Sequence, residues 1–333
     1  MKSTAQKIMV AGCVLVSLSQ LLRVSFTSNT FDGMRGKHLI KTTSGFNKWT
    51  EPCNFHEKGT GPIPVVLMSL GRSGSSVTWD TLSALTGKRN IAFEATGGNP
   101  RSSQVFFEDL VENELAFYNW TVQLLCHIQT RRRDVTEKAG IAGFQWKPFM
   151  SSFNHKYAIE GLNAIGASTD PEIKVVYLRR NALDRKISNL RHEKSTHTSH
   201  SITAHCAVGD DECIKKQLAF ETNFVFPVGA KLIQWLEGSE RRNRMVLKRL
   251  ETSKAKFVQV SYEKLFNGDD AEEWVRILAF LNVGPSSGLT MVDVRAAFSM
   301  AATHKHCRNE TISNFHEVEQ TLIGTEFEHY LYD

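Results

Sequence analysis

The sequence predicts an α/β protein built on a P-loop-like parallel sheet that is flanked by helices on both faces. Three observations favour this fold class. Apolar runs of strand length alternate along the chain with segments of helical periodicity, which is the order that produces a parallel sheet. The first of these runs ends in a short loop of small residues before a helix, as in phosphate-binding folds. The chain of 333 residues is 41% hydrophobic, which is enough to form a large core.

The first strand–loop–helix unit predicts an anion-binding site. Residues 65–70 form an apolar run, and residues 77–85 have the pattern of a helix that ends at Gly87. Backbone N–H groups of the intervening loop and of the helix N-terminus can point toward a bound anion. An ordinary strand-to-helix turn with serine caps is the alternative interpretation. The residues that we expect to bind phosphate are Gly71, Arg72, Ser73, Gly74, Ser75 and Ser76.

The same loop differs from the phosphate loop of nucleoside triphosphatases. That motif requires a lysine after its second glycine, and then a hydroxyl residue that holds magnesium. Here Ser75 follows Gly74, and the positive charge comes from Arg72 within the loop. The loop therefore predicts anion binding without a metal ion.

A second motif of the same kind follows further along the chain. Residues 172–178 form an apolar, β-rich run, and residues 181–193 follow with apolar side chains on one helical face. Asn181 can cap this helix. Arg180 at the strand end and Ser188 two turns into the helix can hold one phosphate from two sides. A solvated basic helix is the alternative interpretation.

The remaining elements continue the alternation. Ligands of parallel sheets bind at the carboxyl ends of the strands, where Glu94, Lys147 and Arg180 fall together with the first loop. Further strands are expected at residues 90–94, at residues 140–146 and from residue 257 onward. Further helices are expected at residues 103–129, 154–165, 211–236 and 271–282, with Pro227 breaking the third of these.

Together the two anion-binding motifs resemble those of the sulfotransferase family. The run Arg-Ser-Gly-Ser-Ser after a strand is similar to the 5′-phosphosulfate loop of the Golgi carbohydrate sulfotransferases. Arg180 with Ser188 is similar to the 3′-phosphate site of the family. Residues 257–265 resemble its late strand and Tyr-Glu-x-Leu signature, and residues 271–283 resemble the helix that follows. The likeness covers residues 64–333.

Two positions depart from the family pattern. Many members have proline two residues after the 3′-site arginine, where this chain has Ala182. Cytosolic members carry lysine in the first loop, where this chain has Arg72. The second difference favours the secretory-pathway branch of the family.

The resemblance implies an enzyme with a sulfotransferase fold that uses 3′-phosphoadenosine-5′-phosphosulfate (PAPS) as its donor. The sulfonate would pass to a hydroxyl of a carbohydrate acceptor, which is a glycan or a glycolipid. Arg72 and the loop amides would stabilise charge on the leaving phosphate. Glu94 would be the general base, with a structural carboxylate as the alternative, and His127 and His155 are weaker candidates. The other expected contacts are those of Lys147 and His155 with the acceptor or the sulfonate, of Tyr262 with adenine, and of Lys305 and Arg308 with the 3′-phosphate.

Other functional classes fit these residues less well. A protein-tyrosine acceptor is the nearest alternative to a carbohydrate, and a non-catalytic glycan-binding protein with the same fold is another. A kinase would need the missing lysine and a carboxylate that binds magnesium. A glycosyltransferase of the same compartment would usually carry an Asp-x-Asp motif, whereas this chain has the adjacent pairs Asp210-Asp211 and Asp269-Asp270.

The N-terminal segment predicts a membrane anchor of the secretory pathway, and the resemblance implies that the membrane is that of the Golgi, with the catalytic domain in its lumen. An apolar run follows Lys2 and Lys7, and these charges favour a cytoplasmic N-terminus. A cleaved signal peptide, which would give a secreted protein, is the alternative. The net charge of +5 suits an anionic cofactor and does not by itself indicate nucleic acid. The oligomeric state, including a homodimer, is left open. The expected organisation is a cytoplasmic tail at residues 1–7, a signal anchor at 8–22, a stem at 23–62 and a lumenal sulfotransferase domain at 63–333.

Cysteines and glycosylation motifs also suit an oxidising lumen. Cys206 and Cys213 flank a turn-rich loop and are the preferred disulfide pair. Histidines near Cys206 match no zinc spacing, so no metal site is expected there. The expected glycosylation sites are Asn119 and Asn309. The pairing of Cys53, Cys126 and Cys307 is left open, and the odd count outside the apolar run would leave one cysteine free.

Overall fold

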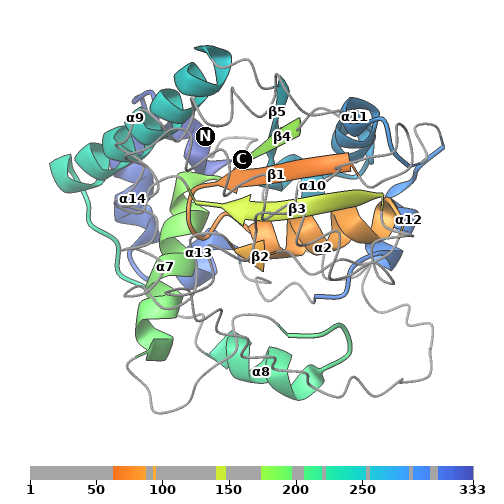
Figure 1. The fold of residues 1–333 in the computed structure, drawn as a ribbon. Coiled ribbons are helices and arrows are strands. Elements are labelled where there is room, and N and C mark those ends of the chain that lie inside the picture. The colour runs from red at the N-terminus through yellow and green to blue at the C-terminus, as the bar shows by residue number, and fades with distance from the viewer. Residues whose placement is uncertain are drawn as a thin grey trace, which may run out of the picture. The chain divides into compact units, whose positions relative to one another are not determined.

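The apolar runs of the sequence form one parallel sheet (Figure 1). The computed structural model describes residues 63–87, 93–94, 140–147, 174–196, 206–219, 223–252, 256–284, 288–300 and 307–332, all within the unit Pro52–Asp333. Within these residues the sheet has five strands in the order β2-β3-β1-β4-β5. They are β1 (Ile63–Ser69), β2 (Phe93–Glu94), β3 (Ile141–Trp146), β4 (Lys174–Arg179) and β5 (Lys256–Ser261).

Parallel pairing brings the carboxyl ends of all these strands to one edge of the sheet. β1 lies between β3 and β4, with Val65 opposite Gly143 and Met68 opposite Tyr177. The chain leaves β1 toward β2 on one side, whereas it leaves β4 toward β5 on the other side. The segments that follow β1 and β4 therefore diverge at a switch point, which is where open α/β sheets bind their ligands.

One face of the sheet packs against four helices. Alternate strand residues such as Leu67 and Val176 are fully buried on this face. Burial of one leucine side chain contributes about 1.5–3 kcal/mol relative to exposure, so this core is a main source of stability. Trp274 is also fully buried, and its indole N–H donates to the Leu265 carbonyl at 2.8 Å. The four helices are α2 (Ser75–Leu85), α10 (Tyr262–Phe266), α11 (Glu272–Leu281) and α12 (Met291–Ala296).

The opposite face of the sheet is covered as well. Val66 and Tyr177 are fully buried there. The Tyr177 hydroxyl donates to Asn243 Oδ1 of α9 (Ala230–Thr252) at 3.0 Å, which places α9 over this face. Burial raises the pKa of Tyr177 to about 12, so this hydroxyl remains a donor. A second core joins α9 to α7 (Ala182–Thr196), α14 (Phe315–Leu322) and η4 (Glu328–Leu331), to the left in Figure 1.

Local side-chain chemistry determines several helix ends. Asn181 caps α7, because its Oδ1 accepts the Leu183 N–H at 2.9 Å. Thr290 and Asp293 form a capping box at the start of α12. Asn282 ends α11 in the left-handed region, with φ 59°. Substituting such a cap by alanine typically costs about 0.5–2 kcal/mol.

The expected fold class, an α/β protein with a parallel sheet and flanking helices, is confirmed. The break expected at Pro227 in the helical stretch 211–236 is confirmed, whereas the expected end at residue 236 is wrong. Two helices, α8 (Asp211–Ala219) and α9, lie on either side of a non-helical stretch that contains Pro227, and α9 continues to Thr252. It continues because Val246 and Leu250 extend its buried stripe under an exposed basic surface.

Other differences concern short elements. The helix expected from residue 77 begins at Ser75, and α12, α13 (Arg308–Thr311), α14 and η4 were not expected at all. These segments are too short to show a clear period in the sequence. The expected helices at residues 103–129 and 154–165 lie outside the described residues.

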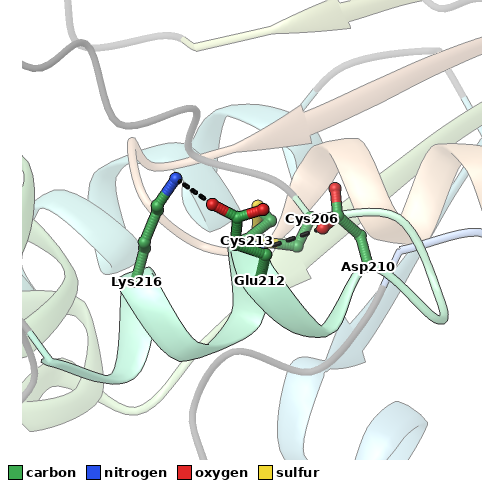
Figure 2. The surroundings of a disulfide bond; sticks show 5 residues. All are labelled: Cys206, Asp210, Glu212, Cys213 and Lys216. Atoms are coloured by element: carbon green, nitrogen blue, oxygen red, sulfur yellow. Dashed lines mark hydrogen bonds and ion pairs between the residues drawn. A yellow bond between two sulfur atoms is a disulfide. The ribbon is translucent and has the colours of Figure 1, made fainter.

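The Cys206–Cys213 disulfide predicted from the sequence is present (Figure 2). Asp210 caps α8 by accepting the Cys213 N–H at 3.0 Å, and Lys216 pairs with Glu212 at 2.7 Å on the exposed surface of the helix. The bond closes a short loop, so it constrains the start of α8 rather than a large part of the unfolded chain.

Cys307 is disulfide-bonded too. Two cysteine bonds of this kind are typical of proteins from oxidising compartments.

Asn309 is exposed on α13, where a glycan would have access to solvent. No helix among the described elements combines the length and hydropathy that a membrane crossing requires. Residues 1–62, which include the expected tail, anchor, stem and Cys53, lie outside the described residues, as do Asn119 and Cys126.

Candidate anion-binding site

The loop between β1 and α2 has a backbone that favours small residues. Arg72 and Gly74 both have positive φ, 66° and 82°. A Cβ on Gly74 would lie 2.3 Å from Tyr262 Cε2, so only glycine fits between the loop and this ring. A Cβ on Gly71, in contrast, would meet no atom within 4 Å, which indicates open space beside the loop.

The N-terminus of α2 is available to an anion. Gly74 is the N-cap residue and provides no side-chain cap. The first bond of the helix runs from Thr78 N–H to Gly74 O at 3.0 Å, so the N–H groups of the preceding turn lack helical acceptors. Together with the helix dipole, these donors favour a bound phosphate or sulfate group.

Basic side chains from α7 and its N-terminal junction hold the loop in this conformation. Arg180 Nη1 donates to Arg72 O at 3.2 Å, and Arg185 Nε donates to Gly71 O at 3.4 Å. Arg72 Nε donates to Ser188 Oγ at 3.2 Å. The two carbonyls are thus occupied by protein donors, which leaves the N–H groups and guanidinium edges for a ligand.

The electrostatics of the loop are those of an anion site. Burial, and then the charge of Arg180, hold the pKa of Arg72 below the ordinary arginine value. Burial and the charge of Arg72 lower the pKa of Lys147 in the same way. Burial lowers the pKa of His192, with a further contribution from Arg72, so the imidazole favours its neutral form. Cations that repel one another at this edge of the sheet would be stabilised by a ligand of high negative charge.

Two buried polar atoms of the site make no hydrogen bond within the described part of the chain. They are Ser73 Oγ and Arg180 Nε. Arg180 also places its guanidinium over the Tyr262 ring, 4.4 Å from the centroid. A ligand oxygen would satisfy such donors, whose burial without a partner costs about 1–3 kcal/mol each.

The two expected phosphate motifs meet. Ser188 lies beside Arg72 of the first motif, and Arg180 contacts both the loop and Tyr262. Lys147 follows β3 and is influenced by the charge of Arg72. Glu94 ends β2, with its Cα paired to Gln145, and therefore belongs to the same carboxyl edge. Its side chain lies outside the described atoms.

Arg308 has a different environment from the one expected of a phosphate contact. Its Nε and Nη2 donate to the two Asp184 oxygens at 2.7 and 3.0 Å, and its Nη1 donates to Tyr330 O at 2.8 Å. Because both edges of this guanidinium already donate hydrogen bonds within the protein, its role is structural, and it links α13 to α7. Lys305, His127 and His155 lie outside the described residues.

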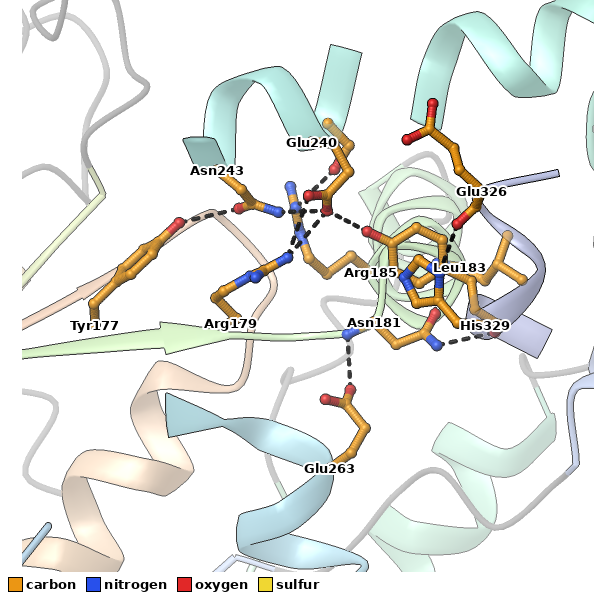
Figure 3. Close-up of polar contacts among 12 residues, drawn as sticks. Tyr177, Arg179, Asn181, Leu183, Arg185, Glu240, Asn243, Glu263, Glu326 and His329 are labelled. Atoms are coloured by element: carbon orange, nitrogen blue, oxygen red, sulfur yellow. Dashed lines mark hydrogen bonds and ion pairs between the residues drawn. The ribbon is translucent and has the colours of Figure 1, made fainter. Parts of the chain in front are cut away.

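Several residues that support the site were not found from the sequence. Glu263 accepts the Asn181 N–H at 2.8 Å and the Ser261 hydroxyl at 2.7 Å, so β5 and α10 hold the start of α7 (Figure 3). Arg185 also donates to Ser239 Oγ at 3.2 Å, and burial, followed by the charge of Arg242, lowers its pKa to about 10. The sequence shows that the residues after β4 are basic, but it does not show which of these side chains face the loop.

No protein-family model matches the chain, and no curated protein matches it. Among the described residues, no group of three or more His, Cys, Asp or Glu side chains is placed to hold a metal ion. A function is therefore inferred from the residues and geometry described above.

Proposed function

We propose that this protein is a sulfotransferase that moves a sulfonate from PAPS to a hydroxyl of a carbohydrate acceptor. The observation that supports it most is the meeting of Arg72, Arg180 and Ser188 beside the uncapped start of α2. The donor carries a phosphosulfate and a second phosphate on one nucleoside. A site with two adjoining clusters of donors suits such a ligand better than it suits a single anion.

Each group has a defined part in this reaction. The α2 N–H groups and Arg72 bind the 5′-phosphosulfate, while Arg180 binds the 3′-phosphate. The acceptor oxygen attacks sulfur and the bond from sulfur to the bridging oxygen breaks, so the electron pair of that bond stays on the leaving phosphate. Arg72 and the loop amides stabilise this developing charge. A general base takes the proton of the acceptor hydroxyl, and Glu94 at the end of β2 is our candidate for it.

Tyr262 and Lys147 complete the proposed assignment. The Tyr262 ring lies against Gly74 and under Arg180, which is next to both proposed phosphate positions. This location suits contact with the nucleoside of the donor. Lys147 lies near Arg72 and suits contact with the sulfonate or with an acidic acceptor.

Calorimetry with the desulfated product, 3′-phosphoadenosine-5′-phosphate (PAP), tests the donor site. Arg72→Ala and Arg180→Ala should each weaken PAP binding by roughly tenfold to a hundredfold, because each removes a charge-assisted hydrogen bond worth about 1.5–3 kcal/mol. Arg241→Ala is the matched control, since it removes an exposed arginine on α9. Equal affinities for all three variants and the parent would contradict the proposed site.

Transfer of labelled sulfonate tests the reaction itself. The full-length chain is incubated with labelled PAPS and a panel of glycans and tyrosine peptides, with and without excess chelator. Labelled glycan is the expected product, and activity should persist in chelator because the loop has Ser75 where metal-dependent phosphate loops have lysine. Labelled peptide alone would establish a protein-tyrosine acceptor instead. Tight PAP binding without transfer to any acceptor would indicate a non-catalytic binding protein.

A further inference from the structure

The residues on both sides of Arg180 are linked to a single tyrosine of η4, Tyr330. Arg179 pairs with Glu240 at 3.2 Å, and Glu240 in turn accepts a hydrogen bond from the Tyr330 hydroxyl. On the other side, Asn181 Nδ2 donates to the Tyr330 carbonyl at 2.9 Å. We refer to Tyr330, Glu240, Arg179 and Asn181 as the latch.

The latch is partly buried and its charges are matched: the side chains of Arg179 and Glu240 are 33% and 15% exposed. Tyr330 and Asn181 are each 4% exposed. Burial alone would raise the pKa of Glu240, but the Tyr330 hydrogen bond and the Arg179 charge lower it below the ordinary value. Burial and the hydrogen bond to Glu240 raise the pKa of Tyr330, so its hydroxyl stays protonated and remains a donor. A partly buried network whose polar groups are paired in this way favours one arrangement of its members.

The network also joins elements that are distant in sequence. Asn243 of α9 donates to Glu240 Oε1 at 3.0 Å, and Arg308 of α13 donates to the Tyr330 carbonyl at 2.8 Å. Tyr330 thereby links α9, α13 and the junction between β4 and α7. The latch holds the side chains of Arg179 and Asn181, the two neighbours of Arg180, and none of its hydrogen bonds involves the Arg180 guanidinium.

Arg180 depends on that backbone for its direction. It lies between β4 and α7, outside either element. Its described contacts are one bond to the Arg72 carbonyl at 3.2 Å and the face of the Tyr262 ring. A long side chain with so few contacts keeps a binding geometry only if its neighbours hold the main chain, since functional groups must be placed within about 0.5 Å.

We propose that Tyr330 is a positioning residue for Arg180. Through the latch it fixes the junction between β4 and α7, so that the guanidinium faces the 3′-phosphate of the nucleotide. The inference depends on the proposed function, because it assumes that Arg180 meets this phosphate. It assigns to η4 a role in ligand recognition although the proposed site includes no residue of η4 itself.

The test measures the part of the affinity that comes from the 3′-phosphate. Dissociation constants for PAP and for AMP, which lacks the 3′-phosphate, are measured by calorimetry, and their ratio reports the Arg180 contact. In the full-length chain, Tyr330→Phe should reduce this ratio about fivefold, because a hydrogen bond to the charged Glu240 is lost. Tyr332→Phe is the control, since it removes a tyrosine hydroxyl of the same C-terminal segment, but one whose hydrogen-bond partner is Glu328 and not a member of the latch. It should leave the ratio within about twofold of the parent value.

Different results separate this inference from the proposed function. An unchanged ratio in Tyr330→Phe, or an equal reduction in both variants, would overturn the positioning role alone. A parent protein that binds PAP no better than AMP would overturn both the 3′-phosphate assignment and the role of Tyr330. If Tyr330→Phe does not fold, Asn181→Ser tests the other arm, because serine keeps a helix cap but loses the donor to the Tyr330 carbonyl. Its ratio should fall as well, and an unchanged value would again overturn the inference.

Discussion

At the scale of single residues, the site depends on cations whose positions are set by neutral partners. Arg72 is held by the Ser188 hydroxyl, and Arg185 is held by the Ser239 hydroxyl, each at 3.2 Å. A hydroxyl orients a guanidinium without neutralising it, so the charge stays available to a ligand. Arg308 shows the contrasting case, because Asp184 engages and neutralises it.

Ser188→Ala should weaken PAP binding by roughly tenfold, since Arg72 loses the acceptor that orients it. Ser83→Ala is the control, because it also removes a buried serine hydroxyl, one that donates to the Asp80 carbonyl within α2. PAP affinity in calorimetry should fall for Ser188→Ala and stay at the parent value for Ser83→Ala, while urea unfolding reports the stability of both variants. An equal or larger loss of affinity in Ser83→Ala would contradict this role of Ser188.

At the scale of elements, the two junctions that follow β1 and β4 make the site. The loop after β1 needs the left-handed conformation at Arg72 and Gly74, and a residue with a side chain is strained there. Bonds from Arg180 and Arg185 to the loop carbonyls offset this strain. These bonds tie the loop to α7 and to its N-terminal junction, which couples the two binding motifs.

Gly74→Ala should destabilise the protein by about 1–3 kcal/mol, because the new Cβ combines positive φ with a clash against Tyr262. Gly238→Ala should have the opposite effect. Gly238 lies within α9 with no atom near its would-be Cβ, so alanine should stabilise the helix by about 0.5–1 kcal/mol. Chemical denaturation of both variants measures these changes. A neutral Gly74→Ala would mean that the loop does not require this backbone.

At the scale of the whole molecule, one partly buried network connects the sheet, α9 and η4. Glu240 is its centre, since it accepts from Arg179, Asn243 and Tyr330. Its lowered pKa makes the network dependent on pH. As the pH falls, the unfolded chain takes up a proton on this carboxyl before the folded protein does. The stabilising contribution of Glu240 is therefore complete at pH values above the pKa of this group in the unfolded chain, roughly 4.3.

This contribution should be lost as the pH falls through the folded pKa of Glu240. The free energy of unfolding of the parent should therefore decrease between roughly pH 5 and pH 3. Glu240→Gln should be less stable at neutral pH and should show a shallower decrease over this range. Glu237→Gln, an exposed substitution on the same helix, should keep the slope of the parent. The curves come from urea unfolding at a series of pH values, and equal slopes for all three proteins would contradict this role.

What the sequence by itself determined is the set of features that depend on neighbouring residues. The apolar runs, the Asn181 cap of α7, the small-residue loop and the Cys206–Cys213 pair all follow from chemistry within a short stretch of chain. So does the fold class, since alternating strands and helices leave a parallel sheet as the ordinary solution.

Only the tertiary structure decided which side chains share the site. Arg72 and Ser188 are 116 residues apart, and Tyr330 and Glu240 are 90 apart. Their contacts exist because β1 pairs with β4 and because α9 and η4 pack beside α7. The sequence places Arg308 and Arg180 in equally basic stretches, yet the fold pairs one with Asp184 and leaves the other beside the loop. Pairings of this kind depend on strand order and helix packing, which no local pattern encodes.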